Sequence, residues 1–571
     1  MKLQSTNTGK IFYFLTFALV PVLVLAIFSK EYRVYDYVFN PDSLYFSSLY
    51  QGLFVEGYPF KTFWLNPSIL LIPDAAIYFT TMAITGDTII TTFIFGILQH
   101  LLIFIGILLI FRKLFSEDSW LLAGFAGFMM MMFLLGAILS NDIIFAAFAL
   151  VSTNHVGAFV MMLFTLTLSL SYLNRPKIPT LVWIFILSML SVFSDRIFIL
   201  MYSLPILFVL TLQYINNKNR ASLILSLSII LSTSLGVLLQ NFVDGRFLYL
   251  SPTPDVISFV NILPAFKTMM ADLAGFILAL NTYTIIILLS LLSWILQFFI
   301  SIKLIRKGDF KSPLSFYILF SVIYIQIIFW MPVVTGTYIA KHILRYNISA
   351  FYLSMINIPI IIYYFSSLRF NKKVITGLLK ITCLVLFIVF MAIGTSHLSR
   401  SGIRNFFNYY PEFVKEIDEI ATQENLLNGV GHFWISKPIT TFSKNEVKIY
   451  HSWPNFVPYF HVNSRMSYTG AGQIFNFAVI SSFDDKNAYR KYLDVEGRTV
   501  KNGNTEVLIL PPFRFDNVTG LPYLVRVHKV SSFLILPARP LSPPPGRRGW
   551  PKGEIPHCQG AGWFFRQMAE S

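Results

Sequence analysis

Runs of about twenty apolar residues recur along most of this chain, and each is long enough to cross a hydrocarbon core of roughly 30 Å as an α-helix. Inside lipid a lone segment satisfies its backbone hydrogen bonds only as a helix. Hydrophobic residues make up 55% of the chain and charged residues 13%, against about 25% charge in soluble domains. We therefore predict an all-α polytopic membrane protein. About eleven spans are expected, at residues 11–28, 88–111, 120–139, 155–173, 180–193, 197–214, 221–242, 283–302, 313–334, 348–365 and 374–393.

Lys and Arg are concentrated in alternate loops between these spans. By the positive-inside rule those loops and the N-terminus are cytoplasmic, and an odd number of spans places the C-terminus outside. Residues 31–74, residues 244–281 and everything after about residue 395 are then expected on the outer face. The net charge of +16 comes largely from such loops, so it does not indicate nucleic-acid binding. The loop cations are Arg112, Lys113, Arg175, Lys177, Lys218, Arg220, Lys303, Arg306, Lys307, Lys311, Arg369, Lys372 and Lys373.

The first outer loop, residues 31–74, carries acidic residues in a chain that is otherwise poor in them. Between Asp42 and Glu56 apolar residues recur at helical spacing, and Ser and Gln take the other positions. That pattern is typical of a helix lying in the membrane interface. Asp42 would begin this helix, where the helix dipole favours negative charge. Because Asp is also a good helix N-cap, two interpretations of Asp42 stay open, a cap and a chemically active carboxylate.

Further polar residues gather at span ends on the predicted outer face. Cations there run against the orientation bias, and a phosphate-bearing lipid would account for them. The alternative is that the Arg side chains are snorkelling anchors, the acids are helix-end charges and His155 is an ordinary interfacial histidine. Acidic residues are almost absent from the middle of the spans, which argues against an ion-coupled transporter. The four clusters are Asn141 and Asp142; Asn154 and His155; Asp195 and Arg196; and Lys341, His342, Arg345 and Tyr346.

The chain changes character after residue 395, where charged and turn residues return. A helical stretch at 412–424 precedes short β-like runs at 447–450, 475–480, 506–510 and 523–530, which predicts a small extracytoplasmic α/β domain over 396–537. Residues 538–571 are rich in Pro, Gly and Arg, unlike the rest. We expect this tail to be disordered, or to result from translation out of frame.

The first outer loop resembles that of the polytopic GT-C glycosyltransferases, which include protein mannosyltransferases and lipid A aminoarabinose transferases. Their loop typically reads Asp-Glu-x-x-Tyr, followed by Gly and then Pro-rich residues. Ser43 stands where many relatives have Glu, which puts a metal-binding role of that position in doubt. The chain also looks like a set of bacterial membrane proteins with no assigned activity. The matching runs are Asp42-Ser43-Leu44-Tyr45-Phe46, Gly57-Tyr58-Pro59, Asn66-Pro67, Pro73-Asp74 and Arg345-Tyr346.

This resemblance implies a GT-C-like membrane domain over residues 1–395 and a glycosyltransferase of the bacterial inner membrane. It would move a sugar from a polyprenyl-phosphate donor to an extracytoplasmic glycan, lipid or protein, with Asp42 as the general base. The planar guanidinium suits phosphate oxygens, so Arg345 and Arg196 are better candidates for the leaving phosphate than Lys341. No cofactor is implied, and a divalent metal is left open. The residues expected to contact substrate are Arg345, Arg196, Lys341, His155, Tyr45, Asp195 and Asp74.

Two other classes of function stay open. A transporter or flippase of lipid-linked saccharide would need a continuous polar path between helices, which the apolar spans disfavour. A non-catalytic membrane scaffold presenting the outer domain would tolerate the loss of Asp42. The sequence leaves the oligomeric state undetermined.

The loop charges predict the sidedness of the chain. A reporter fused after about residue 395 should report an extracytoplasmic location, because five cytoplasmic loops carry the excess of Lys and Arg. Paired fusions that are active only outside or only inside the cell would measure this. A cytoplasmic signal would overturn the span count and move the Asp42 loop with it.

Overall fold

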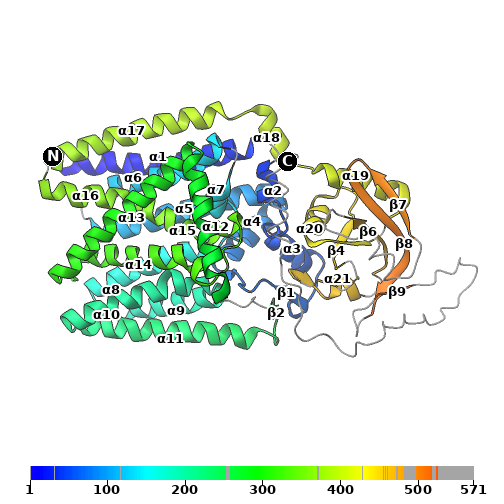
Figure 1. Cartoon of the computed structure of the whole chain (residues 1–571), viewed down its shortest axis with the longest axis horizontal. Helices are drawn as coiled ribbons and strands as arrows, with labels where there is room; N and C mark the ends of the chain where they lie inside the picture. The colour runs from blue at the N-terminus through cyan, green and yellow to red at the C-terminus, as the bar shows by residue number, and fades with distance from the viewer. Residues whose placement is uncertain are drawn as a thin grey trace, which may run out of the picture.

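The computed structural model is a bundle of long helices with a small α/β domain at one end, and the N-terminus lies at the opposite end of the bundle (Figure 1). The structure describes residues 2–30, 33–115, 118–140, 142–251, 258–310, 312–369, 372–426, 428–453, 456, 458–459, 461–470, 473–480, 497–516 and 522–524. The predictions for the tail at 538–571 lie outside these residues. The predicted fold class, a polytopic helical membrane protein with a small sheet-containing C-terminal region, is confirmed.

Within these residues, eleven helices are long and apolar enough to cross a membrane. One of them ends with α12 (Ile262–Leu278), which we had not predicted as a helix. The predicted span at α9 (Ile178–Ser194) is not among them, because this helix is shorter than the others. Figure 1 shows α12 running across the direction of the other long helices. The helices at the predicted spans are α1 (Lys2–Phe28), α5 (Thr88–Leu114), α6 (Ser119–Leu139), α8 (Val156–Asn174), α9, η4 (Ile199–Ser203) with α10 (Leu204–Asn217), α11 (Arg220–Val243), α13 (Thr282–Lys307), α14 (Pro313–Val334), α15 (Ile348–Ile356) with α16 (Ile358–Arg369), and α17 (Lys372–Ser396).

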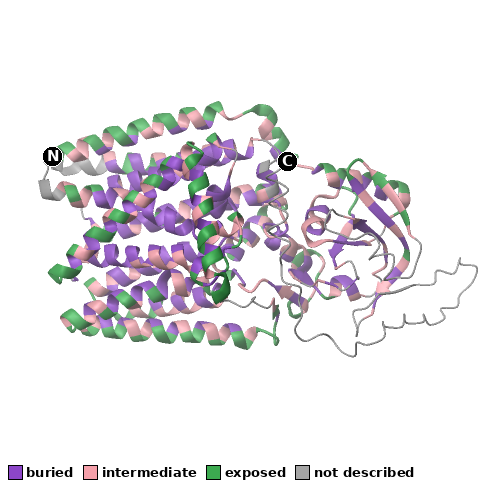
Figure 2. Cartoon of the chain, in the orientation of Figure 1, coloured by how far each residue is buried: buried purple, intermediate pink, exposed green. Residues whose placement is uncertain are grey.

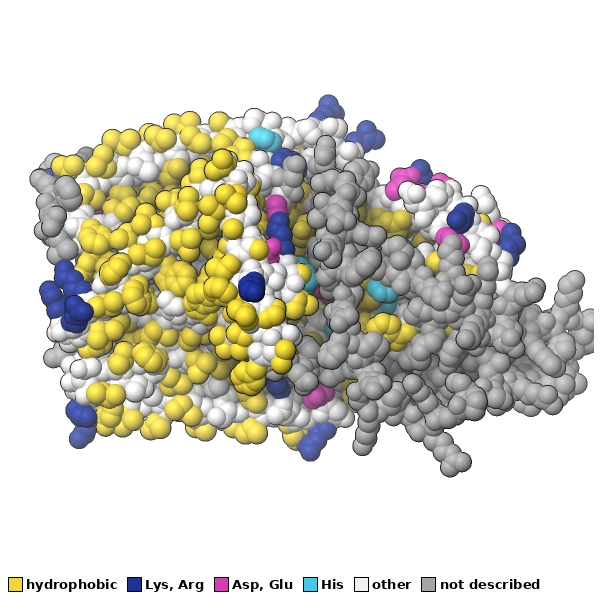
Figure 3. Space-filling view, in the orientation of Figure 1, with side chains coloured by type: hydrophobic (Ala, Val, Ile, Leu, Met, Phe, Trp, Pro, Cys, Tyr) yellow, Lys and Arg dark blue, Asp and Glu magenta, His cyan; other side chains and the backbone are white. Residues whose placement is uncertain are grey.

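The bundle has an apolar outer surface on the face seen and a buried interior (Figures 2 and 3). Hydrophobic side chains cover the face seen in Figure 3, and Lys and Arg gather at its end away from the α/β domain. Inside, Gln297 accepts hydrogen bonds from Ser321 and Asn357, both at 2.8 Å. These bonds join α13 and α14 to the junction of α15 and α16, and they satisfy polar groups that lipid could not.

The first outer loop forms α2 (Arg33–Val38) and α3 (Tyr45–Tyr50), which continues as a π-helical turn over Gln51–Val55. The interfacial position of this helix stays a prediction, but one of its serine positions does not face water. In α3 the residues Tyr45, Phe46, Ser47 and Leu49 are buried, and Ser47 hydrogen bonds to Thr88 at 2.8 Å. Residue Phe54, one helical turn later, is exposed. The amphipathic pattern reflects packing between the bundle and the α/β domain, because α3 contacts α20 (Phe433–Phe442).

The α/β domain is built on a sheet in the order β4-β3-β6-β8-β7, with β9 paired to β8. Three predicted strands are present as β4 (Lys448–His451), β6 (Phe475–Ile480) and part of β8 (Thr505–Phe515), and α19 (Glu412–Glu424) lies where a helix was expected. The run predicted at 523–530 begins in β9 (Pro522–Leu524), and its remainder lies outside the described residues. We missed β3 (Asn428–Gly431) and β7 (Arg498–Asn502). Gly429 in β3 is required because a Cβ there would lie 2.2 Å from the Phe477 ring.

A second, small sheet ties this domain to the bundle. Its order is β2-β1-β5, and its strands are β2 (Tyr249–Leu250), β1 (Phe63–Leu65) and β5 (Asn463–Ser464). One strand comes from each of two outer loops and one from the domain, so the sheet fixes the domain over the first loop. An ion pair of 2.8 Å between Lys448 and Glu56 adds to the same junction.

Lys437, on α20, is buried at this junction and donates to the Val462 carbonyl at 2.7 Å. Burial lowers the pKa of Lys437 from 10.5 to about 7, opposed by Glu56. Between those values the unfolded chain binds a proton that the folded chain does not, so the free energy of unfolding should rise with pH. The slope is at most about 1.4 kcal/mol per pH unit for one proton. We expect the melting temperature of the wild type to rise more between pH 7 and pH 9 than that of Lys437→Met. An equal rise in the two proteins would contradict this.

Candidate active site

Five of the residues singled out in the sequence converge at the end of the bundle that carries the α/β domain. Asp42 comes from the turn before α3, and Arg345 from the 3-10 helix η6 (Lys341–Tyr346). The other three are His155 at the N-cap of α8, Asp195 at the end of α9 and Asp74 in the turn before α4 (Ala76–Thr85). Segments far apart in the sequence thus bring one cation, three carboxylates and a histidine together.

Asp42 pairs with Arg345. The Asp42 Oδ2 lies 3.4 Å from the Arg345 Nη1, and the two side chains are 28% and 33% exposed. This partial exposure leaves both groups accessible to a ligand. The cap interpretation of Asp42 is wrong, because the N-cap of α3 is Leu44 and no side chain caps it. Asn40 shapes the turn by accepting from the Ser43 backbone N–H at 2.9 Å.

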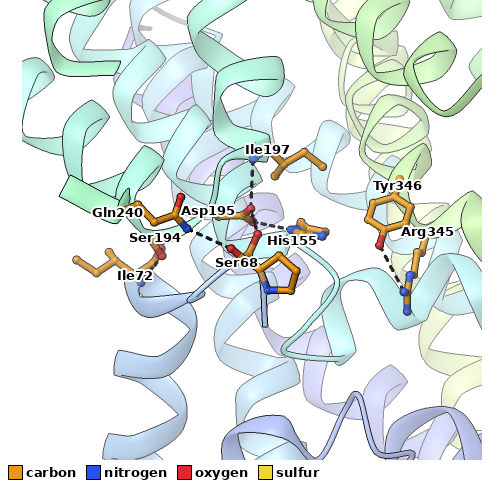
Figure 4. Close-up of polar contacts among 10 residues, drawn as sticks. Ser68, Ile72, His155, Ser194, Asp195, Ile197, Gln240, Arg345 and Tyr346 are labelled. Carbon is orange, nitrogen blue, oxygen red and sulfur yellow. Dashed lines mark hydrogen bonds and ion pairs between the residues drawn. The ribbon is translucent and has the colours of Figure 1, made fainter. Parts of the chain in front are cut away.

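Behind Arg345, aromatic and acidic groups support its guanidinium (Figure 4). Arg345 donates from Nη2 to the Tyr346 hydroxyl at 3.4 Å, and the Tyr346 ring lies 5.4 Å from the His155 ring. The His155 Nδ1 lies 2.6 Å from the Asp195 Oδ2. Asp195 Oδ1 in turn accepts from the Ser68 hydroxyl at 2.9 Å. The arrangement holds the His155 ring in one orientation against Tyr346.

Asp74 is the most deeply buried carboxylate of this group, at 1% exposure. Its Oδ1 accepts from the Gln99 amide at 2.7 Å. Burial raises the pKa of Asp74 well above its ordinary value, and the nearby Asp195 raises it further. Gly157 on α8 is required here, because a Cβ at this position would lie 2.1 Å from the Asp74 Oδ2. Asp74 therefore fixes where α8 begins, next to His155.

Three of the predicted substrate residues lie elsewhere. Arg196 is exposed and donates to Gln240 and, at 2.6 Å, to Asn241 on α11. Lys341 forms an ion pair of 2.6 Å with Asp142 and lies over the Phe276 ring. Tyr45 is fully buried in the apolar cluster around α3 and α4. Asn141 lies outside the described residues. Arg345 is thus the cation that the structure pairs with Asp42.

Sequence reasoning missed the contribution of the α/β domain. The Asp42 carboxylate is close enough to His461 to interact with it electrostatically. The His461 Nδ1 lies 2.7 Å from the Ser251 hydroxyl. Burial lowers the pKa of His461 to about 4, and Asp42 opposes this. Burial and then Arg345 lower the pKa of His342 to about 4 as well. Both imidazoles are therefore neutral near pH 7. His461 stands in no motif, so only the fold places it here.

A metal does not fit at the first-loop motif. Ser43, at the position where Glu is frequent, donates to the Tyr37 carbonyl at 2.9 Å and is 8% exposed. Among the described residues no group of three or more His, Cys, Asp or Glu side chains is placed to hold a metal ion. Two surface cavities, of about 200 and 340 Å³, lie away from the Asp42–Arg345 pair and near Tyr409 and Asn217.

No protein-family model matches this chain, and no curated protein sequence matches it. Among solved structures it is similar to ArnT from Cupriavidus metallidurans, crystallised bound to undecaprenyl phosphate, with a TM-score of 0.50 and 11% sequence identity. The similarity covers 88% of this chain and 97% of that chain. It shows that this chain shares the fold of ArnT, in agreement with the predicted fold.

Proposed function

We propose that this protein is a glycosyltransferase of the bacterial inner membrane. It transfers a sugar from a polyprenyl-phosphate donor to an acceptor outside the cytoplasm. The observation that carries the proposal is the partly exposed Asp42–Arg345 pair at the outer end of the bundle. The fold shared with ArnT, whose crystal structure holds undecaprenyl phosphate, supports the choice of donor.

The chemistry needs a base and a cation, and this pair supplies both. The Asp42 carboxylate takes the proton from the acceptor hydroxyl as that oxygen attacks the anomeric carbon. The bond from the anomeric carbon to the lipid phosphate breaks, and its electron pair leaves with the phosphate. The planar Arg345 fork stabilises the charge that develops there. Because this is a single displacement from the face opposite the leaving phosphate, configuration at the anomeric carbon inverts.

The residues behind the Asp42–Arg345 pair influence the reaction by holding Arg345 in place. Tyr346 lies between Arg345 and His155, and Asp195 orients the His155 ring. We assign His155, Asp195 and Asp74 to positioning Arg345, which must be held within a fraction of an ångström to act on a transition state. Arg196 and Lys341 have partners of their own, so the proposal does not depend on them.

Asp42→Asn tests the base. The variant keeps the side-chain size but cannot take a proton, so transfer should fall by roughly 10²–10⁴-fold at unchanged thermal stability. The assay follows a labelled sugar from polyprenyl phosphate into the envelope fraction of membranes that express each form. Asp87→Asn is the matched control, because Asp87 caps α5 by accepting from Ile90 N–H at 2.8 Å and Asn caps as well. Wild-type transfer by Asp42→Asn would show that Asp42 is not the base, and the catalytic carboxylate would then be sought at Asp36, Asp74 or Asp195.

Arg345→Lys tests the phosphate contact. Lys keeps the charge and loses the planar fork, so the KM for the lipid-linked donor should rise roughly tenfold or the rate should fall to a similar extent. Arg498→Lys is the control, because Arg498 is an exposed residue paired with Glu424 on the domain surface. An Arg345→Lys enzyme with wild-type kinetics would mean that Arg345 is only an anchor.

A further inference from the structure

Six aromatic and imidazole rings of the α/β domain form one continuous group, here named the ring cluster. Phe433 is at its centre, with ring centroids 5.2 Å from His451, 5.9 Å from Tyr459 and 5.5 Å from His461. Trp434 extends the group on one side and Trp453 on the other, at 5.4 Å from Phe433 and Tyr459 respectively. The Tyr459 and His461 rings are stacked, with an interplanar angle of 23°.

The ring cluster is not part of the hydrophobic interior of the domain. The two apolar cores of the domain are formed by other described residues, including Val430 and Phe513 in one and Val414 and Ile439 in the other. Five of the six rings are only half-buried, and His451 alone is fully buried. Large rings left partly exposed on a folded domain indicate a contact surface.

The ring cluster contacts the first loop, which also carries the proposed catalytic carboxylate Asp42. His461 hydrogen bonds to Ser251 in the outer loop after α11, and it pairs through its backbone with Trp64 in β1. The Trp64 ring stacks on Tyr249 at 5.2 Å, which continues the line of aromatic side chains onto the outer loops. His461 is also the domain residue on which Asp42 acts.

Polar atoms beneath the rings lack partners. The His451 Nε2 lies 2.6 Å from the His461 carbonyl, but its Nδ1 has no hydrogen-bond partner within the part of the chain that the structure describes. The buried Ser452 hydroxyl likewise has no hydrogen-bond partner among the described residues. A buried unsatisfied polar group in a native protein calls for a water or a ligand. Burial lowers the pKa of both His451 and His461, so the rings offer neutral donors and acceptors and no charge.

We propose that the ring cluster is a binding subsite for a neutral saccharide, which it holds so that one hydroxyl reaches Asp42. This assignment of an acceptor rests on the proposed function. A pyranose has apolar C–H faces, which pack on aromatic rings, and hydroxyl edges, which bond to imidazole and serine atoms. An anionic ligand is disfavoured, because the nearby buried cation Lys437 already donates to the Val462 carbonyl at 2.7 Å.

The test measures binding by the full-length protein in lipid nanodiscs, without transfer. The probes are neutral tetrasaccharides of glucose, mannose, galactose and N-acetylglucosamine, titrated by calorimetry. We expect at least one to bind, and Trp453→Leu and Tyr459→Leu to weaken it tenfold or more, because Leu keeps apolar bulk but removes the ring. Tyr459→Phe keeps the ring and should retain most of the affinity. Trp183→Leu, at a 57% exposed position on α9, is the control.

The outcomes separate the alternatives. No binding by any probe, or equal affinity in the Leu variants and the control, would overturn the subsite. Quenching of Trp453 fluorescence by brominated lipids, judged against Trp453→Phe, would overturn it too, because the rings would then be a membrane-interface belt. Binding without any sugar transfer by the wild type would keep the subsite and refute the proposed transferase, and transfer without binding would do the reverse.

Discussion

Lipid does not tolerate unpaired charge, and the end of the bundle next to the α/β domain is arranged accordingly. Each carboxylate that converges there has a donor. Asp74 has Gln99, Asp195 has His155 and Asp42 has Arg345. Exposure increases along that series, from 1% for Asp74 and 3% for Asp195 to 28% for the Asp42 side chain. The buried carboxylates of Asp74 and Asp195 hold the backbone in place, and the partly exposed carboxylate of Asp42 is the one that a substrate can reach.

The features that depend on local pattern could be predicted from the sequence. Apolar run length is sufficient to locate a spanning helix, because the bilayer sets the length that a span requires. The approach of Asp42 and Arg345 was also foreseeable, since a carboxylate and a cation on the predicted outer face share one thin layer. The fold implied by the short motif around Asp42 agrees with the fold that the chain shares with ArnT.

Features that depend on distant contacts could not be predicted in this way. The amphipathic pattern of α3 is the same whether its second face meets water or another domain, so the sequence could not reveal that Ser47 is buried. β3 reads Asn-Gly-Val-Gly, a poor strand sequence, and is a strand because it pairs with β4 and β6 on its two sides. The Phe477 ring of β6 leaves room only for glycine at position 429. Arg196 and Lys341 carry the right charge and were predicted at the same membrane face as Asp42. Arg196 instead hydrogen bonds to Asn241 and Lys341 pairs with Asp142. His461 lies within the electrostatic influence of Asp42 only because the small sheet places the domain there.

That small sheet constrains the order in which the protein is made. β1 and β5 lie roughly 400 residues apart in the chain. At about 5–20 residues per second, the ribosome needs on the order of 20–80 s to synthesise the intervening chain. During that interval β1 is an open strand edge outside the membrane, able to pair with other extended chains. Its length of three residues limits that hazard, because so short an edge offers few hydrogen bonds to an unintended partner. The first loop therefore completes its structure only when the last domain arrives, which makes biogenesis of the site a late event in synthesis.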